Sequence, residues 1–594
     1  MDTSSRHQLN STIQATLRRG QRLVQPMYRA LPWLLVLILT AVILYPLFEV
    51  VRQPLTRLPE LWREAQEVPR LGQIMLRTVL LALGSMVLAT FAAMILAWCR
   101  ANLAGRAGAL AQVVAVIPLV IPPLAGVTGW TFLLSPRVGY LNELLRQLPF
   151  LNELQQGPFD IYTLTWIISI TGIYLIPFAF IFIQAGLSNI DPRLEDAARS
   201  AGSTWWGVQF RIVLPLLRPA LVYGGGVVAL LALGQFTAAL LLGRTKGIDV
   251  ITTQLYRLTA TPPPNYPLAT FISMPILLLA LAGVVAQRKA LRGGLRFVMA
   301  GKGVGRVRPH NPALLIPVFI YSFLLVIPPL IGLCLVSLSP YWGSPLTLDN
   351  LSLAAFTEVF NNSVSSRAIA NSLRLSFMAT ILCLVLSLSA AIVVLRTKGV
   401  AQRIVDYIIN VPLAVPAILF GMGIFLSFAL GPATRLARTW LGLSLYGSSA
   451  VMVLAYVVLV VPHGTRMIMS GIAQINPQLE AAARVFGSSA LGAVMRVLAP
   501  LLRRHLVSAA MLMFMLSSHE FAASALLVGP DTQVMSTVLY GQWDTGTYPR
   551  VAALALVMVA ISIVGLAGIV VFDRSNVSVP KSSSRKLFSR RERA

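Results

Sequence analysis

The sequence predicts an all-α polytopic membrane protein whose transmembrane helices form two parallel repeats of six. Three observations support this fold class. The first is composition: 56% of the 594 residues are hydrophobic, only 12% are charged, and the mean hydropathy is +0.75. Soluble proteins carry about 25% charged residues, which excludes a water-soluble fold. The second is a series of about 12 apolar runs, each long enough to cross a bilayer. The third is a segment that occurs twice at a constant spacing.

The basic residues are placed as in a membrane protein. The formal charge of +27 raises the possibility of a nucleic-acid-binding protein, but these residues gather in the two tails and in alternate loops. That distribution orients a protein in a membrane. Cys99, Cys334 and Cys383 stand alone within apolar runs and form no C-x-x-C pair. We expect them to be buried thiols outside any disulfide framework.

The apolar runs divide the chain into two halves joined by a basic linker. Residues 1–29 form a basic tail, and the first half covers 30–287. Its spans are predicted near 30–50, 72–98, 110–134, 162–186, 222–243 and 268–287. The linker 288–311 leads to the second half, 312–572, with spans near 313–338, 371–395, 405–430, 448–470, 507–528 and 551–572. A second basic tail occupies 573–594.

The basic segments also predict the orientation. Lys and Arg concentrate on the cytoplasmic side of membranes, so we expect both tails and the linker to be cytoplasmic. Six spans in each half satisfy this condition, and the loop after the fourth span of each half then faces the cytoplasm. An even number of spans per repeat makes the two halves parallel, related by an axis along the membrane normal.

The segment that occurs twice covers residues 190–221 and 475–506, an offset of 285, since 475 minus 190 is 285. The first copy begins Ile190-Asp-Pro-Arg-Leu-Glu-Asp-Ala-Ala-Arg-Ser-Ala-Gly202, and the second begins Ile475-Asn-Pro-Gln-Leu-Glu-Ala-Ala-Ala-Arg-Val-Phe-Gly487. In each copy Asp191 or Asn476 can cap the start of a helix. The proline that follows fits the first helical position, because that position needs no backbone N–H. Glycine ends the turn, and we expect a second short helix to run to Pro215 or Pro500.

Each copy predicts a short helix with an alanine-rich face. Glu195 and Glu480 lie near the helix start, where the macrodipole favours an anion. A face of this kind suits docking into a groove of a partner. The alternative is an interfacial helix that lies on the lipid, which two copies in register disfavour. The residues at i, i+3, i+4 and i+7 that form the face are Leu194, Ala197, Ala198 and Ala201 in the first copy and Leu479, Ala482, Ala483 and Phe486 in the second.

The repeated segment resembles the cytoplasmic signature loop of permease subunits of binding-protein-dependent ABC importers, with the pattern (E)AA-x3-G-x9-I-x-L-P. The first copy has Asp196 at the acidic position, whereas the second has Ala481 there and Ala499 at the leucine position. Glu195 and Glu480, one residue upstream, are alternative carriers of the acidic role. The matching positions are Ala197, Ala198, Gly202, Ile212, Leu214 and Pro215 in the first copy and Ala482, Ala483, Gly487, Val497 and Pro500 in the second.

The resemblance covers nearly the whole chain, once per half, and implies the MetI-like ABC permease fold with two halves fused. It implies that both helices couple to ATPase subunits, supplied by a homodimer, on the cytoplasmic side of a bacterial inner membrane. A soluble binding protein would deliver substrate to outer loops near 52–70, 135–161 and 244–267 and their counterparts. Fused permeases of this length resemble the ferric-iron and thiamine branches, and ferric iron is favoured. Thiamine, polyamine and phosphonate importers are alternatives, and a twelve-span secondary transporter is a rival of a different class.

The sequence carries no sign of an enzyme. No Walker-type G-x-x-x-x-G-K-[ST] loop occurs, so ATP hydrolysis requires a separate subunit. The five histidines form no metal-ligand cluster, and we expect no metal site and no cofactor.

Paired prolines interrupt the third span of each half, where Ile117-Pro-Leu-Val-Ile-Pro122 matches Val411-Pro-Leu-Ala-Val-Pro416. Each proline removes a helix hydrogen bond, so we expect a kink or break in both spans. Pro118, Pro122, Pro412 and Pro416 are therefore candidates to line a translocation path or to act as a hinge. The alternative is a packing kink without a role in transport.

Gln235 and Glu520 are further candidates for the path, because polar groups inside apolar runs are costly. Gln235-Phe236 aligns with Glu520-Phe521, and Leu255-Tyr256 aligns with Leu539-Tyr540. The alternative is that Gln235 and Glu520 form inter-helix hydrogen bonds that stabilise the bundle.

Overall fold

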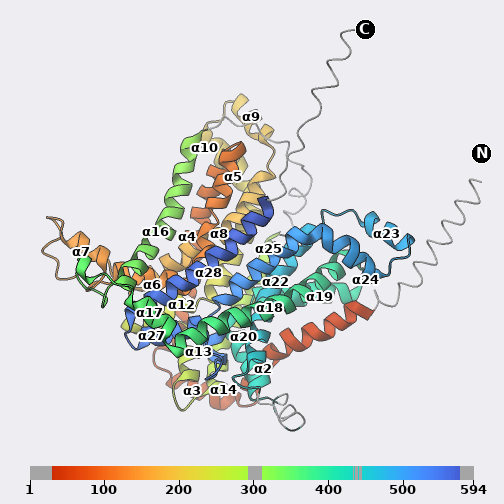
Figure 1. Cartoon of the computed structure of the whole chain (residues 1–594). Coiled ribbons are helices and arrows are strands. Elements are labelled where there is room, and N and C mark those ends of the chain that lie inside the picture. The colour runs from red at the N-terminus through yellow and green to blue at the C-terminus, as the bar shows by residue number, and fades with distance from the viewer. Residues whose placement is uncertain (1–29, 292–310, 432–433, 435–438, 440–444, 575–594) are drawn as a thin grey trace, which may run out of the picture.

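The computed structural model describes residues 30–291, 311–431, 434, 439 and 445–574 (Figure 1). Within these ranges all regular elements are helices, and no β-strand occurs. Ten helices of the described part are long and apolar enough to cross a membrane, and two bent pairs bring the number to as many as twelve. The all-α, multi-span prediction is therefore confirmed. The predicted tail 1–29 and nearly all of the linker 288–311 and the tail 573–594 lie outside the described residues.

The candidate spans follow the two-half order of the sequence. The ten unbroken ones are Ala30–Leu55 (with η1, Thr40–Leu44, and α2, Tyr45–Leu55), Leu71–Ala101 (α4), Leu164–Ser188 (α8), Trp205–Leu233 (α10, Trp205–Val208; η3, Gln209–Val213; α11, Leu214–Leu233), Tyr266–Gln287 (in α14, Tyr266–Leu291), Pro312–Leu338 (η5, Pro312–Leu314; α16, Leu315–Leu338), Ser363–Arg396 (α18), Ser449–Ile472 (α22), Ala490–Ser518 (α24, Ala490–Ala493; η9, Val494–Leu498; α25, Ala499–Ser518) and Tyr548–Gly568 (in α28, Tyr548–Arg574). Short helices between them include α3 (Leu58–Glu67), α7 (Tyr140–Arg146), α9 (Pro192–Ser200), α12 (Thr237–Gly243), α13 (Ile251–Ala260), α17 (Ala354–Asn361), α23 (Pro477–Val485), α26 (Ser524–Leu527) and α27 (Met535–Asp544).

The third span of each half is broken where the paired prolines predict. Gly105–Val120 (α5, Gly105–Val114, and η2, Ile117–Val120) meets α6 (Pro123–Leu134) at 84°. Val400–Leu413 (α19, Val400–Asn410, and η7, Val411–Leu413) meets α20 (Ala417–Ile424) and η8 (Phe425–Ala429) at 108°. Pro122 and Pro416 are the residues that turn the chain, with ψ of 133° and 138° in place of a helical value. The break follows because proline donates no hydrogen bond and disfavours helix in the residue before it.

The fifth span of each half lies earlier in the chain than predicted. The expected spans near 222–243 and 507–528, each preceded by a separate short helix, were wrong; the structure has continuous helices Trp205–Leu233 and Ala490–Ser518. The π-helical turns η3 and η9 explain the difference. In η3, the Leu214 N–H bonds to the Gln209 carbonyl five residues back, and the helix then continues past Pro215, which has no N–H. η9 does the same before Pro500.

The two halves exchange their first spans. α2 packs against α20 of the second half and against α14 of its own, and α16 packs against α6 of the first half and against α28 of its own. Glycines permit the close crossings. A Cβ on Gly129 would lie 2.3 Å from the Pro329 carbonyl oxygen, and one on Gly423 would lie 2.5 Å from the Pro46 carbonyl oxygen. Both crossings thus pair a glycine after the proline break with a proline of the other half's first span.

The remaining long helices form two arms. The first arm contains α4, α8 and α11, which pack against one another, and the second contains α18, α22 and α25. Figure 1 shows the arms diverging from a common base, with α9 at the tip of the first and α23 at the tip of the second. α3, α7 and α27 lie at the base, away from both tips.

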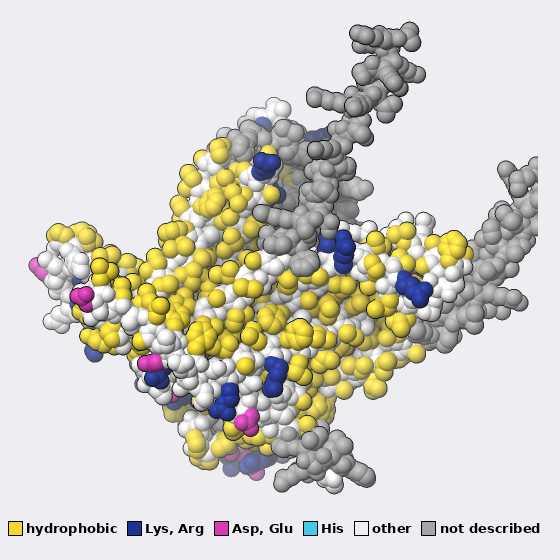
Figure 2. All heavy atoms as spheres, in the orientation of Figure 1, with side chains coloured by type: hydrophobic (Ala, Val, Ile, Leu, Met, Phe, Trp, Pro, Cys, Tyr) yellow, Lys and Arg dark blue, Asp and Glu magenta, His cyan; other side chains and the backbone are white. Residues whose placement is uncertain are grey.

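The surface is apolar over much of both arms, as lipid contact requires. Figure 2 shows hydrophobic side chains covering the visible faces of the arms, whereas Asp, Glu, Lys and Arg lie mainly toward the tips and the base. Cys99 and Cys383 are buried as expected, but Cys334 on α16 is exposed. The expectation of a buried thiol was wrong at Cys334, because an apolar neighbourhood in sequence does not separate core from lipid-facing positions.

Candidate functional site

The helix α9 and the turn after it have the geometry that the repeated segment predicts. The Asp191 side chain accepts a hydrogen bond from the Arg193 backbone N–H at 2.9 Å, and Pro192 occupies the first helical position. Gly202 follows the helix with φ of +84°, and its N–H donates to the Arg199 carbonyl at 2.9 Å. Glycine is preferred there because L side chains disfavour this left-handed conformation. Thr204 then caps α10 by accepting from the Gly207 N–H.

The helix α23 repeats this geometry in detail. Asn476 accepts from the Gln478 N–H at 3.0 Å, and Gly487 has φ of +87° and donates to the Arg484 carbonyl at 3.0 Å. Ser489 caps α24 by accepting from the Gly492 N–H. Each signature helix is therefore followed by a left-handed glycine, a capped short helix, a π turn and a long span.

The apolar face of both helices is open to the outside of the chain. Leu194 is 47% exposed on α9, and Leu479 and Phe486 are 49% and 89% exposed on and next to α23. Ala197 and Ala482 are also exposed, and Ala198 and Ala483 are partly exposed. Ala198 packs in part against the buried core of the first half, so the outer part of each face is the part left open. The two helices thus offer matching apolar surfaces at the tips of the two arms.

The acidic residues of the two copies differ in position. Glu195 and Glu480 are buried, each about 5% exposed, whereas Asp196 and its counterpart Ala481 are exposed. The Glu480 carboxylate accepts from Arg396 Nε at 2.9 Å. The upstream glutamates thus point into the protein, and only the first copy presents an acid on its outer surface.

The proline residues singled out in the third spans lie close to the meeting of the two halves. Pro118, Pro122, Pro412 and Pro416 are all buried. A Cβ on Gly234 of the first half would lie 3.2 Å from the Cα of Pro416 in the second. The break of the second half therefore contacts the end of the first half's fifth span.

Gln235 and Glu520 occupy equivalent loops directly after their fifth spans, not within a helix as the apolar runs suggested. Gln235 Nε2 donates to Thr171 Oγ1 at 3.3 Å. The Glu520 carboxylate accepts from the Ala523 N–H, the Ser524 N–H and the Ser524 hydroxyl at 2.8–3.0 Å. It therefore caps the short helix α26. Both side chains are partly exposed and take part in internal hydrogen bonds.

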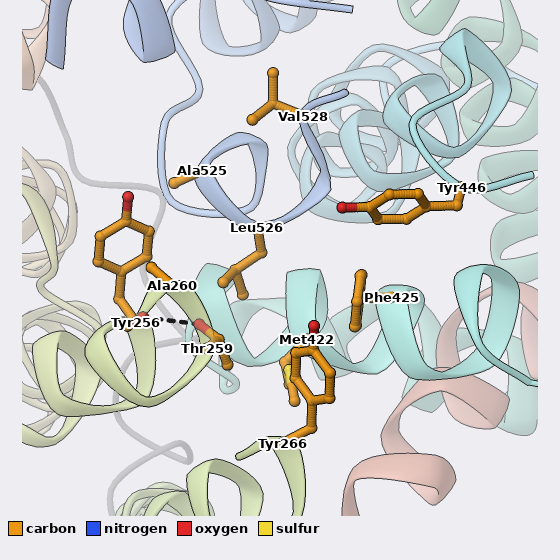
Figure 3. Close-up of a pocket in the computed structure, with 10 residues that line it drawn as sticks. All are labelled: Tyr256, Thr259, Ala260, Tyr266, Met422, Phe425, Tyr446, Ala525, Leu526 and Val528. Atoms are coloured by element: carbon orange, nitrogen blue, oxygen red, sulfur yellow. Dashed lines mark hydrogen bonds between the residues drawn. The ribbon is translucent and has the colours of Figure 1, made fainter. Parts of the chain in front are cut away.

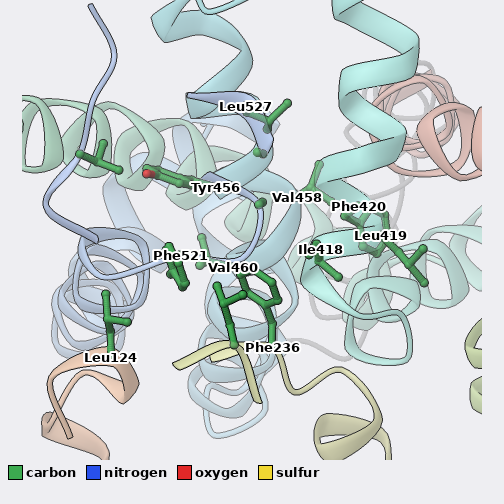
Figure 4. Close-up of a cluster of buried hydrophobic side chains, with 14 of the residues drawn as sticks. Leu124, Phe236, Ile418, Leu419, Phe420, Tyr456, Val458, Val460, Phe521 and Leu527 are labelled. Carbon is green, nitrogen blue, oxygen red and sulfur yellow. The ribbon is translucent and has the colours of Figure 1, made fainter. Parts of the chain in front are cut away.

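Four aromatic rings meet between the halves just beyond these two residues. They are Phe236 and Tyr256 from the first half and Phe521 and Tyr540 from the second, and we call them the aromatic cluster. Phe236 lies 5.3 Å from Phe521 and 5.4 Å from Tyr256, Phe521 lies 5.5 Å from Tyr540, and the two tyrosine rings are 6.2 Å apart. Figure 4 shows Phe236 and Phe521 facing each other among buried side chains of both halves. Phe236 and Phe521 are buried at this contact between the halves.

The cluster extends outward into a polar contact between the halves. Arg244 Nη1 donates to the Tyr540 hydroxyl at 3.3 Å and forms an ion pair with Asp544. Sequence alignment paired Phe236 with Phe521 and Tyr256 with Tyr540, but it did not show that all four rings meet. The repetition of aromatic residues at equivalent positions is the sequence signal that could have identified them.

A cavity of about 160 Å³ lies beside the cluster. Figure 3 shows side chains of both halves around it, and Tyr256 belongs to its wall as well as to the cluster. Burial, reinforced by Tyr540 and Asp544, raises the pKa of Tyr256 to about 12, so this phenol is neutral near pH 7. The other lining residues are Thr259, Ala260, Tyr266, Met422, Phe425, Tyr446, Ala525, Leu526 and Val528.

The described residues contain no group of three or more His, Cys, Asp or Glu side chains that could hold a metal ion. The geometry combines two exposed helices at the arm tips with an aromatic contact between the two halves.

Comparison with known proteins gives one family, matched twice. The family described as "Binding-protein-dependent transport system inner membrane component" matches residues 89–292 and again residues 383–577. Each match contains one copy of the signature segment, and together they cover about two thirds of the chain.

Three curated relatives differ in how much of the chain they share. The ferric transport system permease protein FbpB of Actinobacillus pleuropneumoniae is 23% identical over 504 residues, which are 82% of this chain and 69% of that protein. The putative FbpB 1 of Haemophilus influenzae is 24% identical over 462 residues, 73% of this chain and 66% of that protein. The putative 2-aminoethylphosphonate transport system permease protein PhnV of Salmonella paratyphi A is 28% identical over 246 residues, 41% of this chain and 87% of that protein.

Proposed function

The chain belongs to the family of binding-protein-dependent transport system inner membrane components, and we propose that it forms the substrate path of an ATP-driven importer and couples to ATPase subunits through α9 and α23. As a fused permease it supplies both halves of the path in one polypeptide. It catalyses no reaction itself, and ATP is hydrolysed on the separate ATPase subunits.

One observation carries the coupling role: the two signature helices present the same capped, alanine-rich, exposed face at the tips of two diverging arms. Apolar surface exposed at the end of a membrane protein favours a protein partner. Because the two helices share their caps and their left-handed glycines, one homodimeric ATPase fits both. The coupling residues are Glu195, Asp196, Ala197, Ala198, Gly202 and Pro215 in the first half and Glu480, Ala482, Ala483, Gly487 and Pro500 in the second.

The path would run between the halves and be closed at the base by the aromatic cluster. Gln235 and Glu520 lie directly beside the cluster, and the breaks at Pro122 and Pro416 lie near it. These residues, with Pro118 and Pro412, would line the path or bend to open it. ATP-driven closure of the ATPase subunits would bring α9 and α23 together and separate the halves at the base.

In this proposal the arm tips, both tails and the linker lie in the cytoplasm, and the base faces the outer side of the bacterial inner membrane. The binding protein would dock on the outer loops, which include α3, α7 and the segment 244–267. The proposal keeps the predicted domain limits: a first half at 30–287, a linker at 288–311 and a second half at 312–572, with a basic tail on each side.

Ferric iron is the favoured substrate, because two relatives that match 82% and 73% of this chain are named as ferric transport permeases, the second as putative. The shorter match to an aminoethylphosphonate permease supports phosphonate as an alternative. Thiamine and polyamines remain alternatives from the sequence. Uptake into cells that express the chain with its own ATPase and binding protein would be measured with radioactive iron(III) citrate, thiamine, spermidine and 2-aminoethylphosphonate. Uptake of another substrate without iron would refute the iron assignment.

The coupling role is tested by Gly202→Val with Gly487→Val. A side chain at φ of +84° or +87° is strained by about 1–2 kcal/mol, which would distort the turn that ends each helix. We expect substrate uptake to be lost while the membranes retain ATP hydrolysis. Gly72→Val is the matched control, since its Cβ meets nothing within 4 Å and its φ is not positive.

Unchanged uptake in the double variant would contradict docking at these turns. Uptake that is insensitive to vanadate, with no ATPase bound, would instead identify the twelve-span secondary transporter.

A further inference from the structure

The inner end of α18 is joined to the signature helix α23 by a buried ion pair. Arg396 is the last residue of α18, and its Nε lies 2.9 Å from Glu480 Oε1 on α23. Its Nη2 also donates to the Ile475 carbonyl at 3.1 Å and to the Ile472 carbonyl at 3.4 Å. The side chains of Arg396 and Glu480 are only 14% and 7% exposed. One guanidinium therefore holds the ends of α18, α22 and α23 together.

The electrostatics of this corner favour both charges. Ile472 ends α22, where the helix dipole is negative and a cation is stabilised, and Glu480 lies in the first turn of α23, where an anion is stabilised. Removing either partner would leave a buried, unpaired charge, which is strongly unfavourable. α23 therefore cannot shift independently of α18 while the pair is intact.

The outer end of α18 is joined to the helix that carries Tyr540. The Ser372 hydroxyl of α18 accepts from the Met535 N–H at the start of α27 at 2.8 Å. The Ser365 hydroxyl accepts from Gln542 Nε2 at 3.1 Å. From Ser372 to Arg396 an uninterrupted helix spans about 36 Å. Figure 1 shows α18 running from the neighbourhood of α27 into the arm that ends in α23.

The outer connection is repeated in the first half. The Thr78 hydroxyl of α4 accepts from the Ile251 N–H at the start of α13, the helix that carries Tyr256. At the inner end of α4, Arg100 donates only a 3.4 Å hydrogen bond to the Leu103 carbonyl, and its Nε has no partner among the described residues. Both long helices thus accept a hydrogen bond from the start of a helix that carries one tyrosine of the aromatic cluster.

We propose that Arg396 is a positioning residue for transport, which fixes α23 to α18 so that movement of α23 is transmitted to the aromatic cluster. The proposal rests on the function proposed above and adds the route between the ATPase contact and the closed base. Glu480, one of the coupling residues proposed above, would act in coupling as the buried anchor that ties α23 to α18.

The test measures the distance between the two tyrosine positions. Cys99, Cys334 and Cys383 are replaced by alanine, and Tyr256→Cys and Tyr540→Cys are introduced into the chain reconstituted with its ATPase in liposomes. The new cysteines are cross-linked with copper phenanthroline, without nucleotide and with ATP plus vanadate, and the product is quantified by mass spectrometry. Allosteric coupling typically corresponds to about 5- to 150-fold, so we expect ATP plus vanadate to lower cross-linking at least about fivefold.

Arg396→Ala is expected to abolish this decrease without reducing the amount of ATPase that co-purifies. Arg396→Lys should restore part of it, and the exchange of charges in Arg396→Glu with Glu480→Arg should restore more than Arg396→Glu alone. Arg100→Ala, at the matching end of α4, is the control and should keep the full decrease. Partial rescue by lysine separates positioning from a general loss of fold.

An Arg396→Ala chain that shows the same decrease as its parent would overturn the proposal. A parent chain that binds the ATPase but shows no decrease would overturn the route to the cluster. A parent chain that binds no ATPase would overturn the proposed function itself, and the proposal with it.

Discussion

The exchange of first spans depends on two glycines, and enlarging them by one methyl group tests it directly. Gly129 and Gly423 are equivalent in the repeat and lie on α6 and α20. Each faces the carbonyl oxygen of a proline in the other half's first span, Pro329 or Pro46. Gly129→Ala and Gly423→Ala add a Cβ at these two crossings and change nothing else.

The size of the effect follows from the distances. Real Cβ contacts are essentially never under 3.0 Å, and the added atoms would lie 2.3 Å and 2.5 Å from the two carbonyl oxygens. The helices must therefore separate by about 0.7 Å and 0.5 Å, because a helical backbone carbonyl cannot rotate away as a side chain can. Overpacking of this kind costs about 1–3 kcal/mol for each substitution. The two crossings share no residue, so the double variant should be roughly additive.

Unfolding of the purified protein by sodium dodecyl sulfate in mixed micelles measures the change in stability. Gly565→Ala on α28 is the control, because its Cβ meets nothing within 4 Å. In that position alanine should be neutral or stabilise the helix by up to about 1 kcal/mol. If Gly129→Ala and Gly423→Ala unfold at the same detergent fraction as Gly565→Ala, the close crossings and the exchange that they permit are wrong.

Two further substitutions test individual contacts near the aromatic cluster. Glu520→Ala leaves the Ala523 and Ser524 N–H groups without their acceptor and should lower the free energy of unfolding by about 1–3 kcal/mol per group. Glu520→Gln keeps one acceptor oxygen and should lower it less in the same unfolding assay. Equal losses in the two variants would contradict the capping role. Asp544→Asn removes the ion pair with Arg244, whose two side chains are 60% (Arg244) and 46% (Asp544) exposed. It should lower the free energy of unfolding by at most about 1 kcal/mol, and by less at high salt. A larger loss would show that Arg244 and Asp544 hold the halves together.

Local chemistry explains why the signature helices were predictable. Asp191 or Asn476, then proline, then glycine at the far end, specify a helix start and stop through hydrogen bonds between residues that are near in sequence. The structure has both helices with those caps and both glycines at positive φ. The breaks at Pro122 and Pro416 were predictable for the same reason, since proline acts on its own turn of helix.

The limits of the fifth spans were not predictable from apolar runs. Hydropathy places a span where the residues are most apolar, so it shifted both spans toward 243 and 528. The helices instead start earlier, because the π turns carry them past Pro215 and Pro500. The residues after Leu233 and Ser518 are apolar because the bundle buries them as loops and short helices, not because they cross the bilayer.

The sequence by itself determined the helical class, the two-half repeat, the broken third spans and the two capped helices, because each depends on composition or on contacts within a few residues. Only the tertiary structure decided that the first spans are exchanged, that four aromatic rings from both halves meet, and that Arg396 reaches Glu480 across 84 residues. In a membrane protein the lipid-facing and helix-facing surfaces are equally apolar, so hydropathy cannot specify which helices touch. That choice depends on shape, on glycines that admit a close crossing, and on a few buried polar partners distant in sequence.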